Sequence, residues 1–273
     1  MKKMIKLIIA DMDGTLLNDN HEIHPDFWEM EEALNEKGIK FAIASGRQFY
    51  NLEEKFEKLK DRMMFFAENG TQVMHKGKEL FLNPLDTDAA MDFVKIGREL
   101  PDSFIVLCGK TSAYVENDNP DFLKEIKQFY KALKIVDDLT EVNDTFLKVT
   151  YCNFNGVEEN IFPDLEKFQK DFKVAIAANI FIDITCLTAN KGTAIKGIQE
   201  KLNISPDETL AFGDYLNDLE MMQNATHSYA MKNAHPDIIE ASNFITKYSN
   251  NENGVLRTIE ELGLLKTEKS TVR

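Results

Sequence analysis

Short apolar runs alternate with amphipathic segments of helix length in the first 84 residues. Three apolar runs predict strands, at residues 4–10, 39–44 and 63–67. Two intervening segments have helical spacing, at residues 26–37 and 49–59, and Gly38 marks the end of the first. Buried strands separated by helices are typical of a parallel sheet covered on both faces.

The last third of the chain repeats this pattern. Strands are predicted at residues 209–212, 228–231 and 244–246. Helices are predicted at residues 193–202, 218–223 and 254–262. The polar tail after Leu265 is expected to be disordered.

The middle of the chain differs from both flanking parts. It mixes helical stretches (89–100, 121–133 and 158–172) with strand candidates (104–107, 113–115, 146–151 and 174–177). None of these strands ends in a polar cluster like those of the flanking thirds. We therefore predict an α/β fold in which a Rossmann-like parallel core, residues 1–84 and 187–273, is interrupted by an inserted α+β domain, residues 85–186.

Polar residues stand where the predicted core strands end. They are Asp11, Asp13, Ser45, Asp214 and, just after a predicted strand, Lys191. Ligands of open α/β sheets bind beyond the carboxyl ends of the strands, so these side chains are expected to meet. Taken singly, each is more often a turn, a cap or a solvated charge; together and in this order they indicate one site.

This set of residues has a chemical logic. Three carboxylates would repel one another unless a divalent cation lay between them, and oxygen ligands alone suit Mg²⁺. Lys191, the Ser45 hydroxyl and the N–H groups after the first strand can neutralise a phosphate. One carboxylate can then attack phosphorus, while a second protonates the leaving oxygen and later activates water.

Composition limits the classes of partner that the protein is expected to bind. The net charge of −14 and pI near 4.9 argue against nucleic acid and anionic membranes, which require clustered Lys and Arg. No run approaches the roughly 20 apolar residues of a membrane span, and the N-terminus lacks the features of a signal peptide. The three cysteines have no metal-like spacing and suit a reducing cytoplasm, whereas the oligomeric state is not fixed by the sequence.

Four segments resemble the motifs of the haloacid dehalogenase superfamily, and more narrowly its Cof-type branch, class IIB. They are DMDGTLL (11–17), SGR (45–47), Lys191-Gly192 and GDYLND (213–218). ENG (68–70), AMKNA (230–234) and NNENGV (250–255) match the same branch. CGKTSAY (108–114) further resembles the SupH-like sugar phosphatases, some of which act on a phosphorylated riboflavin precursor, although those relatives carry SGN in place of SGR.

The resemblance implies a role for each matching residue. Asp11 would be the nucleophile and a Mg²⁺ ligand, Asp13 the acid/base and a ligand through its backbone carbonyl, and Asp214 the third ligand. Five residues would hold the phosphoryl group: Met12, Ser45, Gly46, Lys191 and Asn217. Arg47 and Asp218 would contact these phosphate-binding and metal-binding residues without contacting the phosphate themselves.

The inserted segment would be the cap over the substrate. Within it, Lys110 and Tyr114 are candidates for reading a sugar or polyol leaving group, or else they stabilise a turn on the outer face.

The predicted function is a cytoplasmic, Mg²⁺-dependent phosphatase that hydrolyses small phosphate monoesters, such as sugar phosphates, through an aspartyl-phosphate. A sugar phosphomutase or phosphotransferase on the same scaffold stays open, as does a phosphatase for the flavin-pathway ribitylaminouracil phosphate. A P-type ATPase-like domain is disfavoured because those resemble DKTGT and span membranes. A non-catalytic protein is disfavoured because all four acid and base positions are kept.

Overall fold

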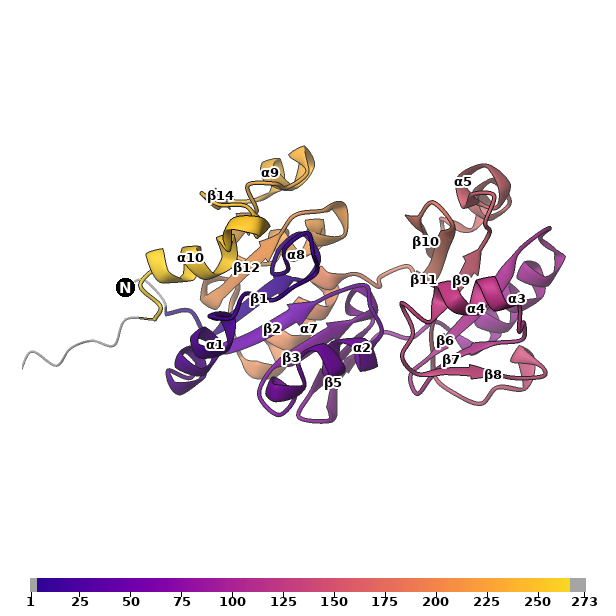
Figure 1. Cartoon of the computed structure of the whole chain (residues 1–273), viewed down its shortest axis with the longest axis horizontal. Helices are drawn as coiled ribbons and strands as arrows, with labels where there is room; N and C mark the ends of the chain where they lie inside the picture. Colours follow the sequence, from indigo (N-terminus) through magenta and orange to yellow (C-terminus); the bar gives the residue numbers. More distant parts are fainter. Residues whose placement is uncertain (1–3, 266–273) are drawn as a thin grey trace, which may run out of the picture. The chain divides into compact units, whose positions relative to one another are not determined.

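The computed structural model describes residues 4–265, so the predicted disorder of the tail lies outside the described residues. The chain forms two compact units, each with its own sheet (Figure 1). Within the described residues, the core unit comprises residues 4–45, 57–81 and 190–265. The inserted unit comprises Leu82–Ala189 and also the segment Gly46–Phe56.

The core unit is built on an eight-stranded sheet with the order β14-β13-β12-β1-β2-β3-β4-β5. The strands are β1 (Leu7–Asp11), β2 (Lys40–Ala44), β3 (Met64–Ala67), β4 (Gln72–His75), β5 (Lys78–Leu82), β12 (Thr209–Gly213), β13 (His227–Ala230) and β14 (Phe244–Ile245). Pairing is parallel from β14 through β3, and β4 then runs antiparallel to β3. The α/β fold class is confirmed, and the antiparallel edge is an addition that the sequence pattern did not reveal.

Helices cover this sheet on both faces (Figure 1). They are α1 (Phe27–Glu36), α7 (Lys191–Leu202), α8 (Leu219–Gln223), α9 (Pro236–Ala241) and α10 (Gly254–Glu261). Ile195 and Ile198 of α7 are fully buried in one cluster with Ile9 of β1. Phe27 of α1 meets Phe41 of β2 edge to face at 5.3 Å. The helix α1 ends before Gly38, whose φ of +74° matches the predicted helix end.

The inserted unit has a six-stranded sheet with the order β10-β11-β9-β6-β7-β8. Its strands are β6 (Phe104–Gly109), β7 (Ala113–Val115), β8 (Leu133–Ile135), β9 (Phe146–Cys152), β10 (Phe172–Ala178) and β11 (Phe181–Cys186). Its longer helices are α2 (Phe49–Lys55), α3 (Thr87–Glu99) and α4 (Pro120–Ile126). Phe93 and Val94 of α3 are buried against Ile105, Val149 and other residues of the sheet.

Two predicted helices of this unit are shorter in the structure. The segment 121–133 is helical only as far as Ile126, and residue 133 already begins β8. The segment 158–172 breaks into α5 (Val157–Asn160), α6 (Phe162–Leu165) and a 3₁₀ turn. Pro163 lies in the first turn of α6, where its missing N–H costs nothing, but it could not continue a preceding helix.

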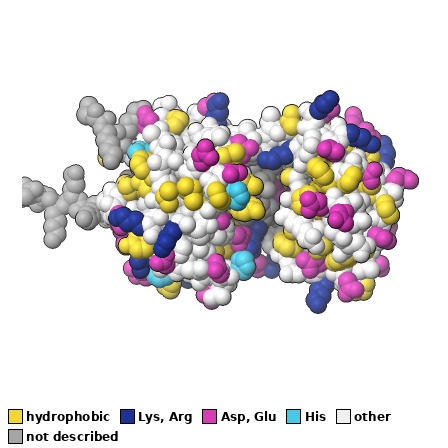
Figure 2. All heavy atoms as spheres, turned by 90° about the horizontal axis from the view of Figure 1, so that it is seen from above, with side chains coloured by type: hydrophobic (Ala, Val, Ile, Leu, Met, Phe, Trp, Pro, Cys, Tyr) yellow, Lys and Arg dark blue, Asp and Glu magenta, His cyan; other side chains and the backbone are white. Residues whose placement is uncertain are grey.

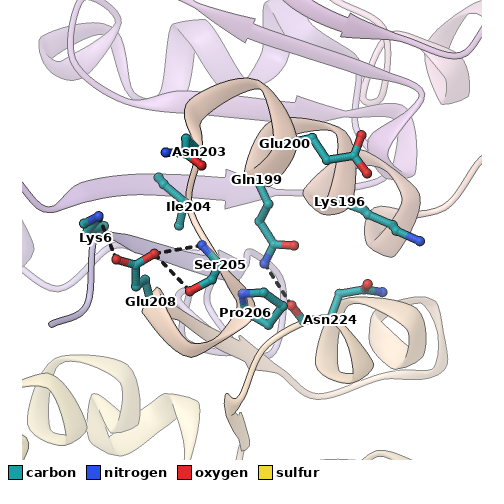
Figure 3. A pocket seen from close by; sticks show the side chains of 10 residues that line it. All are labelled: Lys6, Lys196, Gln199, Glu200, Asn203, Ile204, Ser205, Pro206, Glu208 and Asn224. Carbon is teal, nitrogen blue, oxygen red and sulfur yellow. Dashed lines mark hydrogen bonds and ion pairs between the residues drawn. The ribbon is translucent and has the colours of Figure 1, made fainter. Parts of the chain in front are cut away.

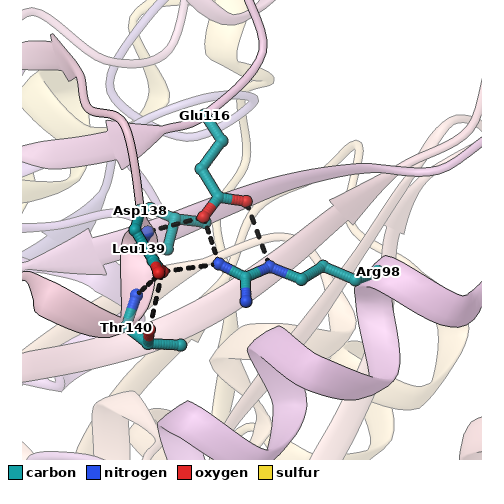
Figure 4. A network of polar contacts seen from close by, with 5 residues as sticks. All are labelled: Arg98, Glu116, Asp138, Leu139 and Thr140. Carbon is teal, nitrogen blue, oxygen red and sulfur yellow. Dashed lines mark hydrogen bonds and ion pairs between the residues drawn. The ribbon is translucent and has the colours of Figure 1, made fainter.

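A polar network joins the last turn of α3 to the segments that follow β7 and β8 (Figure 4). Arg98 on α3 binds both Glu116 and Asp138, the latter at 2.7 Å. Glu116 also accepts the N–H of Leu139 at 2.6 Å, and Asp138 accepts that of Thr140 at 2.8 Å. Every carboxylate in this cluster is used by a neighbour, which indicates a structural role.

Acidic side chains are spread over the surface of both units, in keeping with the net charge of −14 (Figure 2). Among residues 4–265, no helix is both long and apolar enough to cross a bilayer.

A cavity of about 520 Å³ opens at the amino ends of the core strands (Figure 3). Lys6 and Glu208, which directly precede β1 and β12, form an ion pair at 2.6 Å in its wall. Glu208 also accepts the Ser205 hydroxyl, and Gln199 donates to the carbonyl of Asn224. These polar groups form hydrogen bonds and an ion pair with one another. The cavity lies at the amino ends of the strands, whereas Asp11, Ser45 and Asp214 lie at their carboxyl ends.

Candidate active site

Asp11, the last residue of β1, meets Lys191 beyond the carboxyl edge of the core sheet. The Lys191 ammonium donates to Oδ1 of Asp11 and, at 2.6 Å, to Oδ1 of Asp218. Burial by itself would lower the pKa of Lys191, but the attraction of the two carboxylates is stronger and raises it. The sequence predicts Lys191 just after a strand; in the structure β11 ends at Cys186, and Lys191 is the first residue of α7, after an N-cap in which Asn190 accepts the N–H of Thr193.

Asp214 follows β12 and lies against the loop that follows β1. Its Oδ1 accepts the hydroxyl of Thr15 at 2.7 Å, and its backbone carbonyl accepts the N–H of His235 at 2.8 Å. Burial, and then the charges of Asp218 and Asp13, raise the pKa of Asp214 to about 6, although the Thr15 hydrogen bond acts against the rise. A carboxylate in this position is destabilised by like charges and therefore favours a nearby cation.

Asp218 is fully buried and is held at both oxygens. Its Oδ1 binds Lys191, and its Oδ2 accepts the backbone N–H groups of Asp214 and Tyr215 at 3.0 and 3.2 Å. Gly213 permits this packing, since a Cβ there would lie 2.7 Å from the Cβ of Asp218. The carboxylate thus closes the turn that presents Asp214 and orients Lys191.

The acidic residues fit a divalent cation. Oxygen atoms of Asp11, Asp214 and Asp218 lie within 4.8 Å of one another. Three carboxylates face one ammonium, and burial followed by the charges of Asp218 and Asp214 raises the pKa of Asp11 well above its usual value. An all-oxygen donor set with excess negative charge suits Mg²⁺. Asp218 accepts hydrogen bonds at both oxygens, whereas Asp11 and Asp214 accept theirs at Oδ1, so Asp11 and Asp214 fit a cation better than Asp218 does.

The carboxylate of Asp13 is not one of these three clustered carboxylates. Its Oδ1 is 3.1 Å from Nδ1 of His21, and 40 % of its side chain is exposed. An acid/base must reach both the leaving group and water, so this exposure suits the role that the family resemblance implies.

The remaining phosphate candidates of the core unit lie beside this cluster in sequence or through hydrogen bonds. Ser45 follows β2 and is buried, and its carbonyl accepts the N–H of Asn69. Oδ1 of Asn69 accepts a hydrogen bond from the side-chain amide of Asn217 at 3.0 Å. Met12 is fully buried directly after Asp11. Gly46 and Arg47 belong to the inserted unit, and their roles stay predictions.

Two asparagines that sequence reasoning left without a role anchor the loop after β1. Asn233 donates to the carbonyl of Gly14 at 2.8 Å, and Asn250 donates to that of Leu17 at 3.1 Å. The two are joined, because the N–H of Asn250 donates to Oδ1 of Asn233 at 3.0 Å. The motifs AMKNA and NNENGV were the available signal, and the structure gives them this anchoring role.

In the inserted unit, Tyr114 is a buried residue of β7, next to the turn that joins β6 to β7. Its hydroxyl donates to Oδ2 of Asp144 at 2.9 Å and lies 3.0 Å from the hydroxyl of Thr111, which itself donates to Asp144 at 2.7 Å. Gly109 allows this contact, since a Cβ there would lie 2.4 Å from the same Asp144 oxygen. The hydroxyl of Tyr114 thus stabilises the adjacent turn, which is the structural alternative that the sequence left open. Lys110, on the same turn, stays a candidate for reading the leaving group.

Comparison with known proteins agrees with this geometry. The model of the haloacid dehalogenase-like hydrolases matches residues 8–259. The chain belongs to this family. Residues 8–259 include every core motif named above, from Asp11 to NNENGV, and the predicted family is confirmed.

Relatives within the family support the same conclusion. The chain is 32 % identical to the 5-amino-6-(5-phospho-D-ribitylamino)uracil phosphatase YbjI of Escherichia coli over 265 residues, 94 % of this chain and 96 % of that protein. A crystal structure from Eubacterium rectale has 29 % identity and a TM-score of 0.88, covering 95 % of this chain and all of that one. The subclass IIB sugar phosphatase BT4131 shares the fold, with a TM-score of 0.77 and 22 % identity over 95 % and 99 % of the two chains. The prediction that this member of the hydrolase family is a phosphatase is confirmed.

Proposed function

We propose that this enzyme is a Mg²⁺-dependent phosphatase that hydrolyses small phosphate monoesters through an aspartyl-phosphate on Asp11. The observation that carries the proposal is the buried Lys191 ammonium, which joins Asp11 to Asp218 beside Asp214. The proposed nucleophile, a fixed cation and the proposed metal ligand would then share one small volume, which supports the mechanism.

In the first step, an Asp11 oxygen attacks phosphorus, and the bond between phosphorus and the ester oxygen breaks. Lys191, held between Asp11 and Asp218, neutralises the phosphoryl oxygens. Ser45, Asn217 and the backbone N–H groups near Met12 and Gly46 supply further hydrogen bonds. Asp13, protonated, gives its proton to the departing oxygen, so that an alcohol leaves.

In the second step, water attacks the phosphorus of the aspartyl-phosphate. Asp13, now a carboxylate, takes the proton of that water, and the bond between Asp11 and phosphorus breaks. Inorganic phosphate and the free Asp11 carboxylate result, and Asp13 is protonated again. One carboxyl group thus acts in both steps, which suits its partial exposure to solvent.

Asp11, Asp214 and the backbone carbonyl of Asp13 would hold the Mg²⁺ ion. When bound, Mg²⁺ supplies charge neutralisation that lets a phosphate dianion approach the carboxylates. The two buried carboxylates with raised pKa values and the oxygen-only donor set support this assignment.

We further propose that residues 85–186 act as the cap and that a sugar or polyol phosphate is the substrate class. Lys110, in the turn between β6 and β7, is the candidate for reading the leaving group, and this substrate class rests on the family resemblance. A ribitylaminouracil phosphate is the second candidate, favoured by the 32 % identity to YbjI, whose name gives that substrate. A cytoplasmic location stays a prediction from the sequence. A mutase activity stays an open alternative.

The test is phosphate release from a panel of sugar phosphates, polyol phosphates, 5-amino-6-(5-phospho-D-ribitylamino)uracil and p-nitrophenyl phosphate, with Mg²⁺ and with EDTA. We expect turnover with Mg²⁺ and none in EDTA, and none from Asp11→Asn, which cannot form the acyl-phosphate. Asp92→Asn, an exposed carboxylate paired with Lys95, is the matched control and should keep full activity. Turnover by Asp11→Asn, or full activity in EDTA, would refute the mechanism.

A further inference from the structure

The chain that leaves β1 turns back so that His21 meets Asp13. Nδ1 of His21 lies 3.1 Å from Oδ1 of Asp13. Isolated bridges pair Asp13 with Leu17 and Leu17 with Ile23, so the segment doubles over itself. With Asp13 ionised, the Nδ1–H of His21 donates to its carboxylate.

This loop is firmly built. Oδ1 of Asn18 accepts the backbone N–H groups of Asn20 and Glu22 at 3.0 and 2.9 Å, and the N–H of His21 donates to the carbonyl of Asn18 at 2.8 Å. Such local bonds are the means by which an asparagine fixes a turn. The ring of His21 is therefore presented by an ordered backbone.

A distant part of the chain anchors the same loop. Asn251 both donates to the Asp19 side chain at 2.8 Å and accepts the Asp19 N–H at 3.0 Å. Asn250 adds a hydrogen bond to Asp19 at 2.9 Å. The motif that anchors the loop after β1 thus also sets the position from which His21 reaches Asp13.

The backbone of His21 is in the left-handed region, with φ of +59°. A residue with a Cβ costs roughly 1 kcal/mol more than glycine there, and asparagine adopts this region more readily than most residues. The turn by itself would be satisfied by either. The residue found carries an imidazole, and that imidazole contacts the proposed acid/base.

We propose that His21 is a positioning residue that holds the Asp13 carboxyl group in the orientation for proton transfer. This rests on the proposed function, in which Asp13 is the acid/base. Asp11 and Asp218 each bind buried Lys191, and Asp13, a 40 % exposed side chain with two rotatable bonds, binds His21. A hydrogen bond from a loop that is itself anchored restricts those rotations.

The alternative is an exposed pair of little consequence, since such pairs contribute about 0–1 kcal/mol to stability. The two explanations predict different kinetics. Proton donation matters for a poor leaving group and hardly for a good one, so a positioning residue affects substrates unequally. A surface pair without function affects neither.

The experiment compares His21→Gly with His21→Asn. Glycine removes the ring and also relieves the backbone, whereas asparagine keeps an N–H donor near the position of Nδ1 and tolerates a positive φ. The substrates are phenyl phosphate and p-nitrophenyl phosphate, which have similar shapes but poor and good leaving groups. The value of kcat/KM reports the steps up to formation of the aspartyl-phosphate.

For His21→Gly we expect kcat/KM to fall about tenfold on phenyl phosphate, the effect of losing one hydrogen bond to a charged group, and less than about twofold on p-nitrophenyl phosphate. His21→Asn should recover most of the loss. In an Asp13→Ala background, His21→Gly should cause no further change on phenyl phosphate. Thermal unfolding of each variant separates a folding defect from a kinetic one.

Equal losses on both substrates, no recovery by His21→Asn, or an additive loss in the Asp13→Ala background would overturn the inference. A selective loss in Asp13→Ala with none in His21→Gly overturns it while leaving the proposed function intact. No selective loss in Asp13→Ala removes the acid/base role itself, and with it the role of His21.

Discussion

Gly14 and Asp214, which are far apart in the sequence, approach so closely that no side chain fits between them. A Cβ atom on Gly14 would lie 2.3 Å from Oδ2 of Asp214, and the φ of Gly14 is +81°. Gly14, the glycine of DMDGTLL, therefore allows the carboxylate of Asp214, a proposed Mg²⁺ ligand, to lie against the loop after β1. Thr15, the next residue, binds the other oxygen of that carboxylate.

Gly14→Ala should abolish most of the activity through displacement of Asp214. Misplacement of a catalytic group by about 1 Å can cost about 100-fold in rate, so kcat/KM on p-nitrophenyl phosphate should fall at least that far. Gly38→Ala is the matched control, because its φ of +74° brings the same backbone strain, roughly 1 kcal/mol, but nothing lies within 4 Å of the new Cβ. Similar activity in the two variants would contradict this account.

The raised pKa of Asp214 predicts how pH affects the metal-free protein. Its pKa rises from 3.8 to about 6, through burial and then the charges of Asp218 and Asp13. Between these two values the folded state binds more protons than the unfolded state. The stability contributed by this group is therefore present below pH 3.8 and is lost as the pH rises to about 6. In EDTA, the melting temperature should be higher at pH 5 than at pH 7.

Mg²⁺ should reverse this dependence. The ion favours the ionised carboxylates, so it should raise the melting temperature more at pH 7 than at pH 5. Asp214→Asn should reduce both the pH dependence in EDTA and the Mg²⁺ shift, since the titrating ligand is gone. A Mg²⁺ shift of equal size at both pH values, or one unchanged in Asp214→Asn, would show that the ion binds elsewhere.

Asp13→Ala should separate the two half-reactions. With p-nitrophenyl phosphate the leaving group needs little proton donation, so Asp11 should still be phosphorylated, whereas hydrolysis lacks its base. We expect a burst of p-nitrophenolate followed by a turnover reduced by about 100-fold or more, with phosphoenzyme trapped by acid quench. Asp11→Asn should show no burst. Equal slowing of both steps, without a trapped intermediate, would count against the role of Asp13.

The core of the fold could be predicted because its signals are local. Each buried run that ends in a polar cluster became a strand: Asp11 ends β1, and Ser45 and Asp214 follow β2 and β12 as the pattern indicates. Parallel strands place their carboxyl ends along one edge, so residues far apart in sequence met without further information. The edge strands β4 and β5 were missed because they carry no such polar ending.

The partners of the site could not be predicted, since they depend on side chains that meet across the fold. Nothing near Asn250 in the sequence says that its amide binds the carbonyl of Leu17. Asp144 likewise gave no signal, although its carboxylate binds Thr111 in the turn beside Lys110 and Tyr114 in β7. The helix predicted over 158–172 failed for a reason that the sequence did contain, the proline at position 163.

Substitutions of Tyr114 and Lys110 should distinguish a structural role from a role in reading the leaving group. Tyr114 is 6 % exposed, and its hydroxyl is bound to Asp144 and Thr111. Tyr114→Phe should lower the free energy of unfolding by about 1 kcal/mol, the usual value of such a hydrogen bond, and leave the ranking of substrates unchanged.

Lys110→Ala should change the ranking of substrates and leave the free energy of unfolding nearly unchanged. Its backbone N–H donates to the carbonyl of Thr145, which the substitution keeps, so stability should change little. If its ammonium binds the hydroxyl groups of a sugar or polyol, kcat/KM on the preferred sugar phosphate should fall about tenfold, while turnover of p-nitrophenyl phosphate, which lacks those groups, should stay within about twofold. Lys95→Ala, an exposed lysine of the same unit paired with Asp92, is the matched control. Parallel losses on both substrates, or no loss on either, would mean that the turn is structural throughout and that specificity resides in other residues of the inserted unit.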